Sequence, residues 1–207
     1  RLDRIEQSRV FHFGSVSMTD EPARSATLFA ARYAREHGLT VSYDPNLRRN
    51  LWSDEQTARQ YIREGLDLCD VAKLSDEECT FLCGDGEIDA LGHRLLAEHP
   101  NLKLLFVTCG AGGSYAFCGS RMAFVPGFSV KIADTTGAGD AFVGAVLYQI
   151  LRRGGLREAY SPAELEQLLT FGNAVGALSV QRYGAIPAIP TLAETESFLH
   201  AQGLLGA

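Results

Sequence analysis

Asp134-Thr135-Thr136-Gly137-Ala138-Gly139-Asp140 stands directly before an apolar stretch that runs from Ala141 to Leu151. A glycine-rich turn at the start of a helix presents free N–H groups and the positive end of the helix dipole. Because glycine has no Cβ, an anion can approach the backbone closely, and such turns bind phosphate. The stretch therefore predicts a phosphate-binding turn that leads into an apolar helix.

Two known kinds of phosphate-binding loop do not match this turn. No Gly-Lys-Ser follows it, so it is not a P-loop, and its glycine spacing differs from the dinucleotide pattern GxGxxG. Asp140 has two interpretations: a charge at a helix start, worth ~0.3–1 kcal/mol, or a carboxylate that accepts a proton from an attacking hydroxyl. Asp134 is either a turn residue or a cation ligand.

Strand-like and helix-like segments alternate along the whole chain. This alternation predicts an α/β fold with a mainly parallel sheet and helices on both faces. Strands are expected at Val10–Phe13, Leu39–Tyr43, Val71–Leu74, Leu104–Thr108, Ser114–Phe117, Met122–Val125 and Ser129–Ile132. Helices are expected at Pro22–His37, from the capping box Ser53–Gln56 to Leu68, from the capping box Ser75–Glu78, and at Ile88–His99, Asp140–Leu151, Pro162–Arg182 and Thr191–Ala201.

Ligands of such sheets bind beyond the carboxyl ends of the strands. The loops expected to carry the site are those at Gly14, Asp44, Ser75, Gly110 and Asp134. The sequence has no internal repeat, linker or low-complexity segment. We therefore expect a single domain over residues 1–207.

Composition indicates a globular protein with small-molecule ligands. The 207 residues are 46% hydrophobic and 21% charged, with a net charge of -6, which argues against disorder. No Lys/Arg-rich run and no apolar stretch of ~20 residues occurs, so neither nucleic acid nor membrane is an expected partner.

The cysteines indicate a reducing, cytoplasmic location. There are five, at irregular spacing: Cys69, Cys79, Cys83, Cys109 and Cys118. Cys79 and Cys83 lie four residues apart, but no histidine or second cysteine pair completes a zinc set. We expect reduced thiols that pack as small apolar residues.

The stretch Asp134–Asp140, followed by Ala141-Phe142, resembles the signature of the ribokinase-like (pfkB) carbohydrate kinases. The resemblance implies that Asp140 is the catalytic base and also contacts the sugar. It also implies that Gly137, Ala138 and Gly139 form an anion hole for the transferring phosphoryl group. Asp134 and the carbonyl of Thr136 would then belong to a monovalent-cation site.

Two further segments resemble the family in the expected order. Val107–Gly113 is similar to its nucleotide-binding strand end, so Thr108, Gly110 and Gly113 are expected to bind ATP, together with Gly139. Lys73–Glu78 is similar to the element N-x-x-E, which helps to place magnesium and phosphates. Glu78 matches it, with an indirect role toward Mg²⁺. Ser75 stands where Asn is usual and is kept as an ATP-binding candidate. Both residues are equally well explained as a helix capping box.

The tail Ser179–Pro190 resembles the second loop of the family's cation site. Its backbone carbonyls at Ser179, Arg182 and Gly184 would complete the shell, with potassium as the candidate ion. Ribokinases carry a serine near Ala188, and alanine has no side-chain oxygen. The resemblance therefore implies a weaker or incomplete potassium site.

The segments Phe11–Ser15 and Asp44–Trp52 resemble the fructokinase branch. Arg48, on a loop at the expected active edge, would hold a sugar oxygen or a phosphate; its alternative is a solvated loop residue. Kinases of the same fold for 2-keto-3-deoxygluconate, aminoimidazole riboside or ribose remain alternatives. A non-catalytic fragment that binds nucleotide or sugar is the alternative of another class.

The combined interpretation is an ATP- and Mg²⁺-dependent kinase that phosphorylates a small sugar, fructose first, at a hydroxymethyl group. The resemblance covers residues 10–199 and not the family's N-terminal third, which supplies most sugar contacts and a β-sheet lid. ATP and the sugar are the expected partners. A homodimer is one expected state of a full-length protein.

Overall fold

The computed structural model describes residues 1–204 and groups them into two compact units. The first unit comprises residues 1–107 and 117–120, and the second comprises 108–116 and the described residues from 121 onward. The last three residues of the domain expected over 1–207 lie outside the described residues. That a single domain covers the chain stays a prediction.

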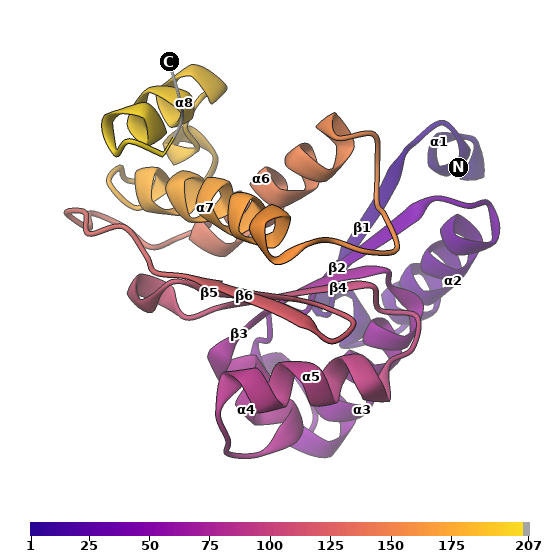
Figure 1. Cartoon of the computed structure of the whole chain (residues 1–207). Helices are drawn as coiled ribbons and strands as arrows, with labels where there is room; N and C mark the ends of the chain where they lie inside the picture. Colours follow the sequence, from indigo (N-terminus) through magenta and orange to yellow (C-terminus); the bar gives the residue numbers. More distant parts are fainter. Residues whose placement is uncertain (205–207) are drawn as a thin grey trace. The chain divides into compact units, whose positions relative to one another are not determined.

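The first unit is built from strands and helices in alternation (Figure 1). Strands β1 and β2 are parallel and in register from Val10↔Thr40 to Gly14↔Asp44, and β2 and β3 are parallel as well. The carboxyl ends of these strands therefore lie at one edge of the sheet. The elements are α1 (Leu2–Glu6), β1 (Val10–Gly14), α2 (Ala23–Glu36), β2 (Thr40–Asp44), α3 (Glu55–Leu68), β3 (Val71–Ser75), α4 (Asp76–Cys83), α5 (Ile88–Glu98) and β4 (Leu104–Thr108).

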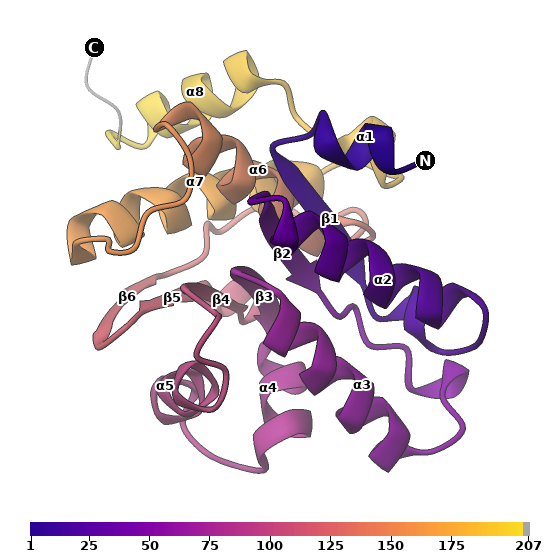
Figure 2. The ribbon, with the colours of Figure 1, turned by 90° about the vertical axis from the view of Figure 1, so that its right-hand side faces the viewer.

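The second unit is mainly helical. Helices α6 and α7 lie side by side in Figures 1 and 2, and α7 also packs on β6 and α8. A Cβ added at Gly172 of α7 would lie 2.6 Å from the ring of Phe142 on α6, so glycine permits this close approach. Its elements are β6 (Arg121–Val125), α6 (Ala138–Arg152), α7 (Pro162–Ser179) and α8 (Leu192–Ala201), and strand β5 (Ser114–Cys118) is divided between the two units after residue 116.

The sheet has six strands in the order β1-β2-β3-β4-β5-β6. The expected α/β class with a mainly parallel sheet is confirmed. Residues Leu104–Val107 of β4 are fully buried, as their unbroken apolar run predicts for a strand covered on both faces. The expected hairpin of two short strands is also confirmed, as β5 and β6.

Four details differ from the sequence prediction. Helix α3 is capped by Asp54, whose side chain accepts the N–H of Thr57, and not by Ser53. Residues 129–132 form no strand, and Ser129, Val130 and Ile132 instead line a cavity. Helix α7 ends at Ser179, three residues before Arg182. Helix α1 was not predicted, because its five residues include none that is buried.

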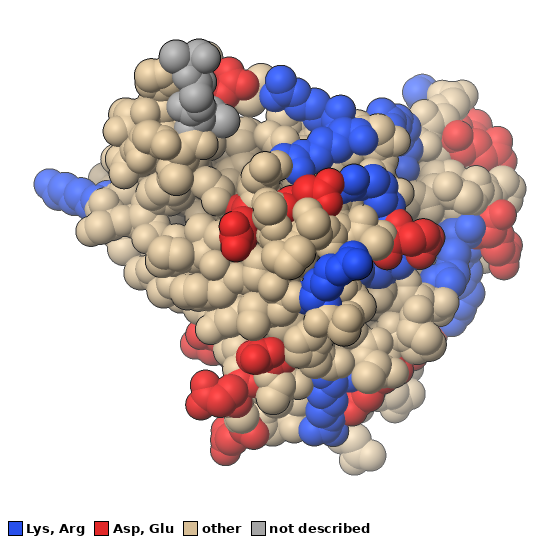
Figure 3. Space-filling model, in the orientation of Figure 1, with Lys and Arg blue, Asp and Glu red and all other residues tan. Residues whose placement is uncertain are grey.

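Charged side chains of both signs are interspersed on the face drawn in Figure 3. None of the five cysteines, all of which lie in the described residues, forms a disulfide bond. Within residues 1–204, no helix combines the length and apolar character that crossing a bilayer requires.

Candidate active site

The glycine-rich turn of the second unit ends in the N-cap of α6. Gly137 is that N-cap and has a φ of 78°, in the left-handed region that favours glycine. Helix α6 begins at Ala138, two residues earlier than predicted, so Gly139 and Asp140 lie in its first turn. The amides of a first turn have no partner within the helix. The turn therefore presents N–H groups and a helix dipole, as the sequence predicts for an anion site.

Asp140 is exposed in this first turn. Its carboxylate makes no hydrogen bond or ion pair with the other described residues. The nearby Asp134 behaves differently, because it is fully engaged in the turn. A carboxylate without a partner can accept a proton from a bound hydroxyl, which is the role implied for Asp140.

Asp134 joins the turn to the tail loop. Its Oδ1 accepts hydrogen bonds from the N–H of Thr136 at 2.9 Å and from the hydroxyl of Thr136 at 2.7 Å. Its Oδ2 accepts the N–H of Gly184 at 3.0 Å. The bonds from Thr136, and then the bond from Gly184, hold the pKa of Asp134 below its ordinary value. Asp134 thus takes part in the turn, the structure brings it together with the predicted tail loop, and its role as a cation ligand stays a prediction.

The tail loop follows α7 directly. The carbonyl of Ser179 accepts the N–H of Arg182 at 3.4 Å, and the carbonyl of the intervening Val180 accepts the N–H of Asp134 at 3.2 Å. Asp134, Ser179, Arg182 and Gly184 therefore belong to one connected region. Ala188 lies in a single turn of 3-10 helix and is fully buried.

A cavity of about 410 Å³ lies next to this turn, and all of its lining residues belong to the second unit. The predicted nucleotide residues Thr108, Gly110 and Gly113 line it, together with Ala138 and Gly139 of the anion turn. Two segments that are remote in sequence therefore meet at one cavity, as the predicted ATP site requires.

Gly113 is needed for the shape of this cavity. Its φ is 118°, and an added Cβ would lie 2.2 Å from the carbonyl oxygen of Val125. The loop after β4 consequently touches the segment after β6. Asn173 of α7, which the sequence analysis missed, also lines the cavity.

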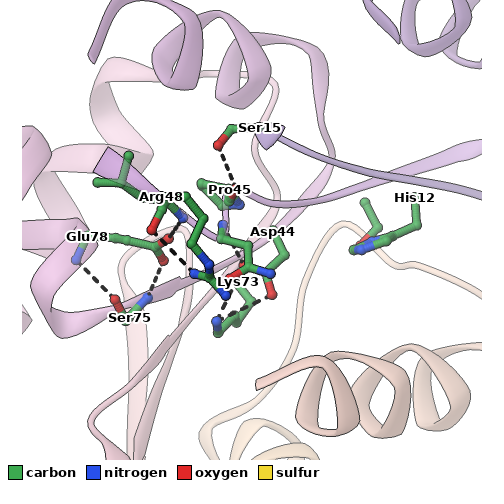
Figure 4. A network of polar contacts seen from close by, with 11 residues as sticks. His12, Ser15, Asp44, Pro45, Arg48, Lys73, Ser75 and Glu78 are labelled. Atoms are coloured by element: carbon green, nitrogen blue, oxygen red, sulfur yellow. Dashed lines mark hydrogen bonds and ion pairs between the residues drawn. The ribbon is translucent and has the colours of Figure 1, made fainter. Parts of the chain in front are cut away.

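A second, polar cavity of about 370 Å³ lies in the first unit. Arg48, Ser75 and Glu78, which the sequence analysis placed in the site, line it together with Lys73. Figure 4 shows these residues around the loop after β2 and the start of α4. The structure thus brings the three predicted residues of this unit together.

Glu78 is only 7% exposed, and both of its carboxylate oxygens accept backbone hydrogen bonds. Oε1 accepts the N–H of Leu47 at 2.7 Å, and Oε2 accepts the N–H of Ser75 at 2.8 Å. The hydroxyl of Ser75 in turn accepts the N–H of Glu78 at 3.1 Å, which completes the predicted capping box. Glu78 therefore fastens the loop that carries Arg48 to the start of α4 (Figure 4).

A buried ion pair lies beside this carboxylate. The Nζ of Lys73 is 3.3 Å from Oδ2 of Asp44, and the two residues are 9% and 4% exposed. Sequence reasoning singled out Asp44 only as the start of a loop and Lys73 only as part of a motif. The pair could have been predicted from the expected parallel strands, because Asp44 and Lys73 both lie near the carboxyl ends of neighbouring strands.

The chain is similar to known proteins over most of its length. The model of the family described as pfkB family carbohydrate kinase matches residues 1–192. Fructokinase-2 of Solanum lycopersicum is 44% identical over 198 residues, which are 96% of this chain and 60% of that protein. An Arabidopsis thaliana protein that carries a fructokinase name is 43% identical over 202 residues, which are 98% of this chain and 95% of that protein.

Two solved structures show the same fold. A fructokinase from Xylella fastidiosa with bound ATP has a TM-score of 0.88 and 33% identity, over 98% of this chain and 65% of that chain. A double-mutant fructokinase from Vibrio cholerae, in a form with fructose, ADP and potassium bound, has a TM-score of 0.82 and 35% identity, over 92% and 60%. The chain spans about 60% of the length of curated relatives such as fructokinase-2 of Solanum lycopersicum.

Proposed function

The chain belongs to the pfkB family of carbohydrate kinases, and on that premise we propose that the protein transfers the γ-phosphoryl group of ATP to a hydroxymethyl group of fructose. The product is fructose 6-phosphate. One observation carries the proposal: the cavity lined by Thr108 and Gly113 is also lined by the first residues of α6, and Asp140 stands unpartnered in the same helical turn.

The proposed reaction uses groups of this chain. Asp140 takes the proton of the sugar hydroxyl while the hydroxyl oxygen attacks the γ-phosphorus, and the bond to the bridging oxygen of ADP breaks. In this proposal the backbone amides of Gly137 and Gly139 stabilise the charge that develops on the phosphoryl oxygens, while the N–H of Ala138 donates to the carbonyl of Thr135 at 3.3 Å and helps to hold the turn. A fixed turn needs no reorganisation during the reaction, which is why such amides are effective.

Magnesium and potassium fit this chain differently. The described residues contain no group of three His, Cys, Asp or Glu side chains that could hold a metal, and both oxygens of Glu78 already accept backbone N–H groups. These residues do not fit a directly held Mg²⁺. We propose that magnesium enters on the ATP phosphates, with phosphate and water as its ligands. Potassium is proposed at Asp134 and the carbonyls of Thr136, Ser179, Arg182 and Gly184.

Fructose is the proposed acceptor for two reasons. Relatives that carry a fructokinase name are 43–44% identical over nearly the whole chain. Arg48 is exposed at the rim of a polar cavity, held only by a 3.4 Å hydrogen bond to the carbonyl of Leu47, so its guanidinium can turn to a sugar oxygen. The proposed location is the cytoplasm, where ATP is present and thiols stay reduced.

A kinase assay with the complete reading frame that contains this chain tests the proposal. We expect kcat/KM for fructose to exceed that for ribose, adenosine, 2-keto-3-deoxygluconate and aminoimidazole riboside. A higher value for any other acceptor would reject fructose as the substrate. No transfer to any acceptor, with ATP still bound, would support the non-catalytic alternative.

A further inference from the structure

The cavity of the second unit has no charged side chain in its lining. Five of its lining residues carry large apolar side chains, two phenylalanines and three aliphatic residues. These are Phe128, Val130, Ile132, Phe142 and Val180. The purine base of a bound nucleotide would be held against these side chains by dispersion and by the removal of apolar surface from water. Neither effect depends on the amino or carbonyl groups attached to the purine ring.

Asn173 carries the one amide side chain of the lining, and the structure already uses it. Its Oδ1 accepts the hydroxyl of Ser114 at 2.7 Å. Its Nδ2 donates to the carbonyl of Val125 at 3.1 Å and to that of Pro126 at 3.4 Å. Both donors of the amide are thus occupied. Asn173 joins the segment after β6 to α7 and the start of β5, and no N–H of its amide is left to donate to a nucleotide base.

Backbone groups of the loop after β4 also form hydrogen bonds within the chain. The N–H of Cys109 donates to the carbonyl of Gly113 at 2.8 Å, and the N–H of Gly112 donates to that of Cys109 at 2.9 Å. The N–H of Gly127 donates to Gly112 at 3.4 Å. The N–H groups of Cys109, Gly112 and Gly127 are therefore already paired within the chain.

Two hydroxyl-bearing residues, Ser129 and Thr135, are exposed and also line the cavity. A hydroxyl rotates and serves as donor or acceptor, so it meets the amino group of adenine and the carbonyl of guanine equally well. We infer that this cavity binds purine nucleoside triphosphates with little discrimination between adenine, hypoxanthine and guanine. The inference rests on the proposed function, because it takes the cavity as the nucleotide site.

The expected selectivity follows from the kind of contact. An apolar pocket distinguishes similar ligands by roughly 10²-fold at most, whereas a site that hydrogen-bonds a distinguishing group rejects the analogue by roughly 10⁴-fold or more. Dissociation constants of ATP, ITP and GTP should therefore lie within about 100-fold of one another. ITP differs from ATP only in the 6-carbonyl that replaces the 6-amino group. GTP carries the same carbonyl and an additional 2-amino group, so ITP separates the effects of the two changes.

The experiment is calorimetric titration of the purified chain with each nucleotide and Mg²⁺. A spread below about 100-fold supports the inference. Binding of ATP more than about 100-fold tighter than that of ITP or GTP overturns it and leaves the proposed kinase intact. Failure of all three nucleotides to bind overturns both, so the two failures are distinguishable.

Variants of Asn173 test its role as a positioning residue. Asn173→Ala should weaken ATP and GTP together, because it loosens the wall, and the ratio of their dissociation constants should change by less than about threefold. A larger change in this ratio would show that the amide reads the base. Ser114→Ala removes only the hydroxyl partner and gives the same test if Asn173→Ala does not fold. The matched control is Asn101→Ala, whose amide donates to the carbonyl of Asp67 in the first unit.

Discussion

Gly184 donates its backbone N–H to the carboxylate of Asp134 over 3.0 Å, although 50 residues separate them. A second contact lies beside it, because a Cβ placed on Gly137 would be 3.1 Å from the Cβ of Ala185. The anion turn and the tail loop are therefore fastened to each other at two points. A substitution in either segment should therefore alter the conformation of the other.

We expect Gly137→Ala to lower the free energy of unfolding by about 1–2 kcal/mol, because a left-handed φ strains any residue with a Cβ. The contact with Ala185 adds to this cost, and kcat should fall because the amides of the turn move. Urea denaturation and a kinase assay measure the two effects.

Gly144→Ala is the matched control for this prediction. Gly144 lies in the same helix, has no heavy atom within 4 Å of an added Cβ and has no positive φ. Alanine there should stabilise the protein by about 0.5–1 kcal/mol and leave kcat unchanged. Equal effects of the two substitutions would contradict the role given to Gly137.

Asp140→Asn should reduce kcat by about 10²–10⁴-fold, because the amide cannot take the proton of the sugar hydroxyl. The dissociation constant of ATP should change by only a few fold, since the shape of the helix start is kept. Turnover and calorimetry of the complete protein measure both. Retention of more than a tenth of the wild-type turnover would remove Asp140 from the mechanism.

Glu194 predicts a pH dependence of stability. Its pKa is lowered to about 2, first by the ion pair with Arg182 and then by hydrogen bonds from Thr191. A carboxylate whose pKa is lower in the folded state contributes stability above its unfolded pKa and loses it as the pH falls. The free energy of unfolding should therefore decline between pH of about 4.5 and 2.

This decline should become shallower in Glu194→Gln, measured by urea denaturation at several pH values. Glu196→Gln is the control, because Glu196 lies on the same helix and pairs with Arg152 only at 3.7 Å. An identical pH profile for Glu194→Gln and the wild type would show that the bonds of Glu194 contribute nothing in solution.

Glu78→Gln should raise KM for the sugar more than KM for ATP. Glutamine keeps one acceptor oxygen and brings an NH₂ group against an N–H donor, so the loop with Leu47 and Arg48 loses one of its anchors. The Mg²⁺ concentration for half-maximal activity should not change if the carboxylate holds the loop. Glu87→Gln is the control, because Glu87 is exposed and does not line this cavity. An increase in the Mg²⁺ requirement would assign Glu78 to the metal.

Potassium should stimulate kcat modestly. Asp134 and the loop carbonyls supply part of a cation shell, and Ala188 supplies no hydroxyl, so the affinity is low. The test is a KCl titration at constant ionic strength with a large inert cation. Ala188→Ser should lower the potassium midpoint. Full activity without potassium or sodium, or an unchanged midpoint in Ala188→Ser, would contradict the proposed site.

Much of the fold was predictable because it depends on local patterns. The buried run of β4, the capping box at Ser75 and the glycine-rich turn before α6 each lie within a few residues of sequence. The errors occurred where a local pattern had competitors. Ser53 and Asp54 are both good N-caps, and only the extended backbone of Asp54 decides between them.

The site was predictable in part for the same reason. The motif residues that line the two cavities are close in sequence to their glycines or capping partners. Asn173 was missed because its partners, Ser114 and Val125, are 59 and 48 residues away and none belongs to a motif. The pair of Lys73 and Asp44 was missed because it forms only when strands β2 and β3 align.

All residues that line the apolar cavity belong to residues 108–116 and 121–180, and Arg48, Lys73, Ser75 and Glu78 belong to the other unit. The proposed nucleotide cavity and the polar groups near Arg48 are thus encoded in separate stretches of the gene. We expect recombination with a relative to exchange one without the other. A chimaera that receives residues 108–116 and 121–204 should acquire the low selectivity between ATP, ITP and GTP inferred for this chain and keep the acceptor preference of its host. Because the two units are encoded separately, donor selectivity and acceptor preference should be able to evolve independently.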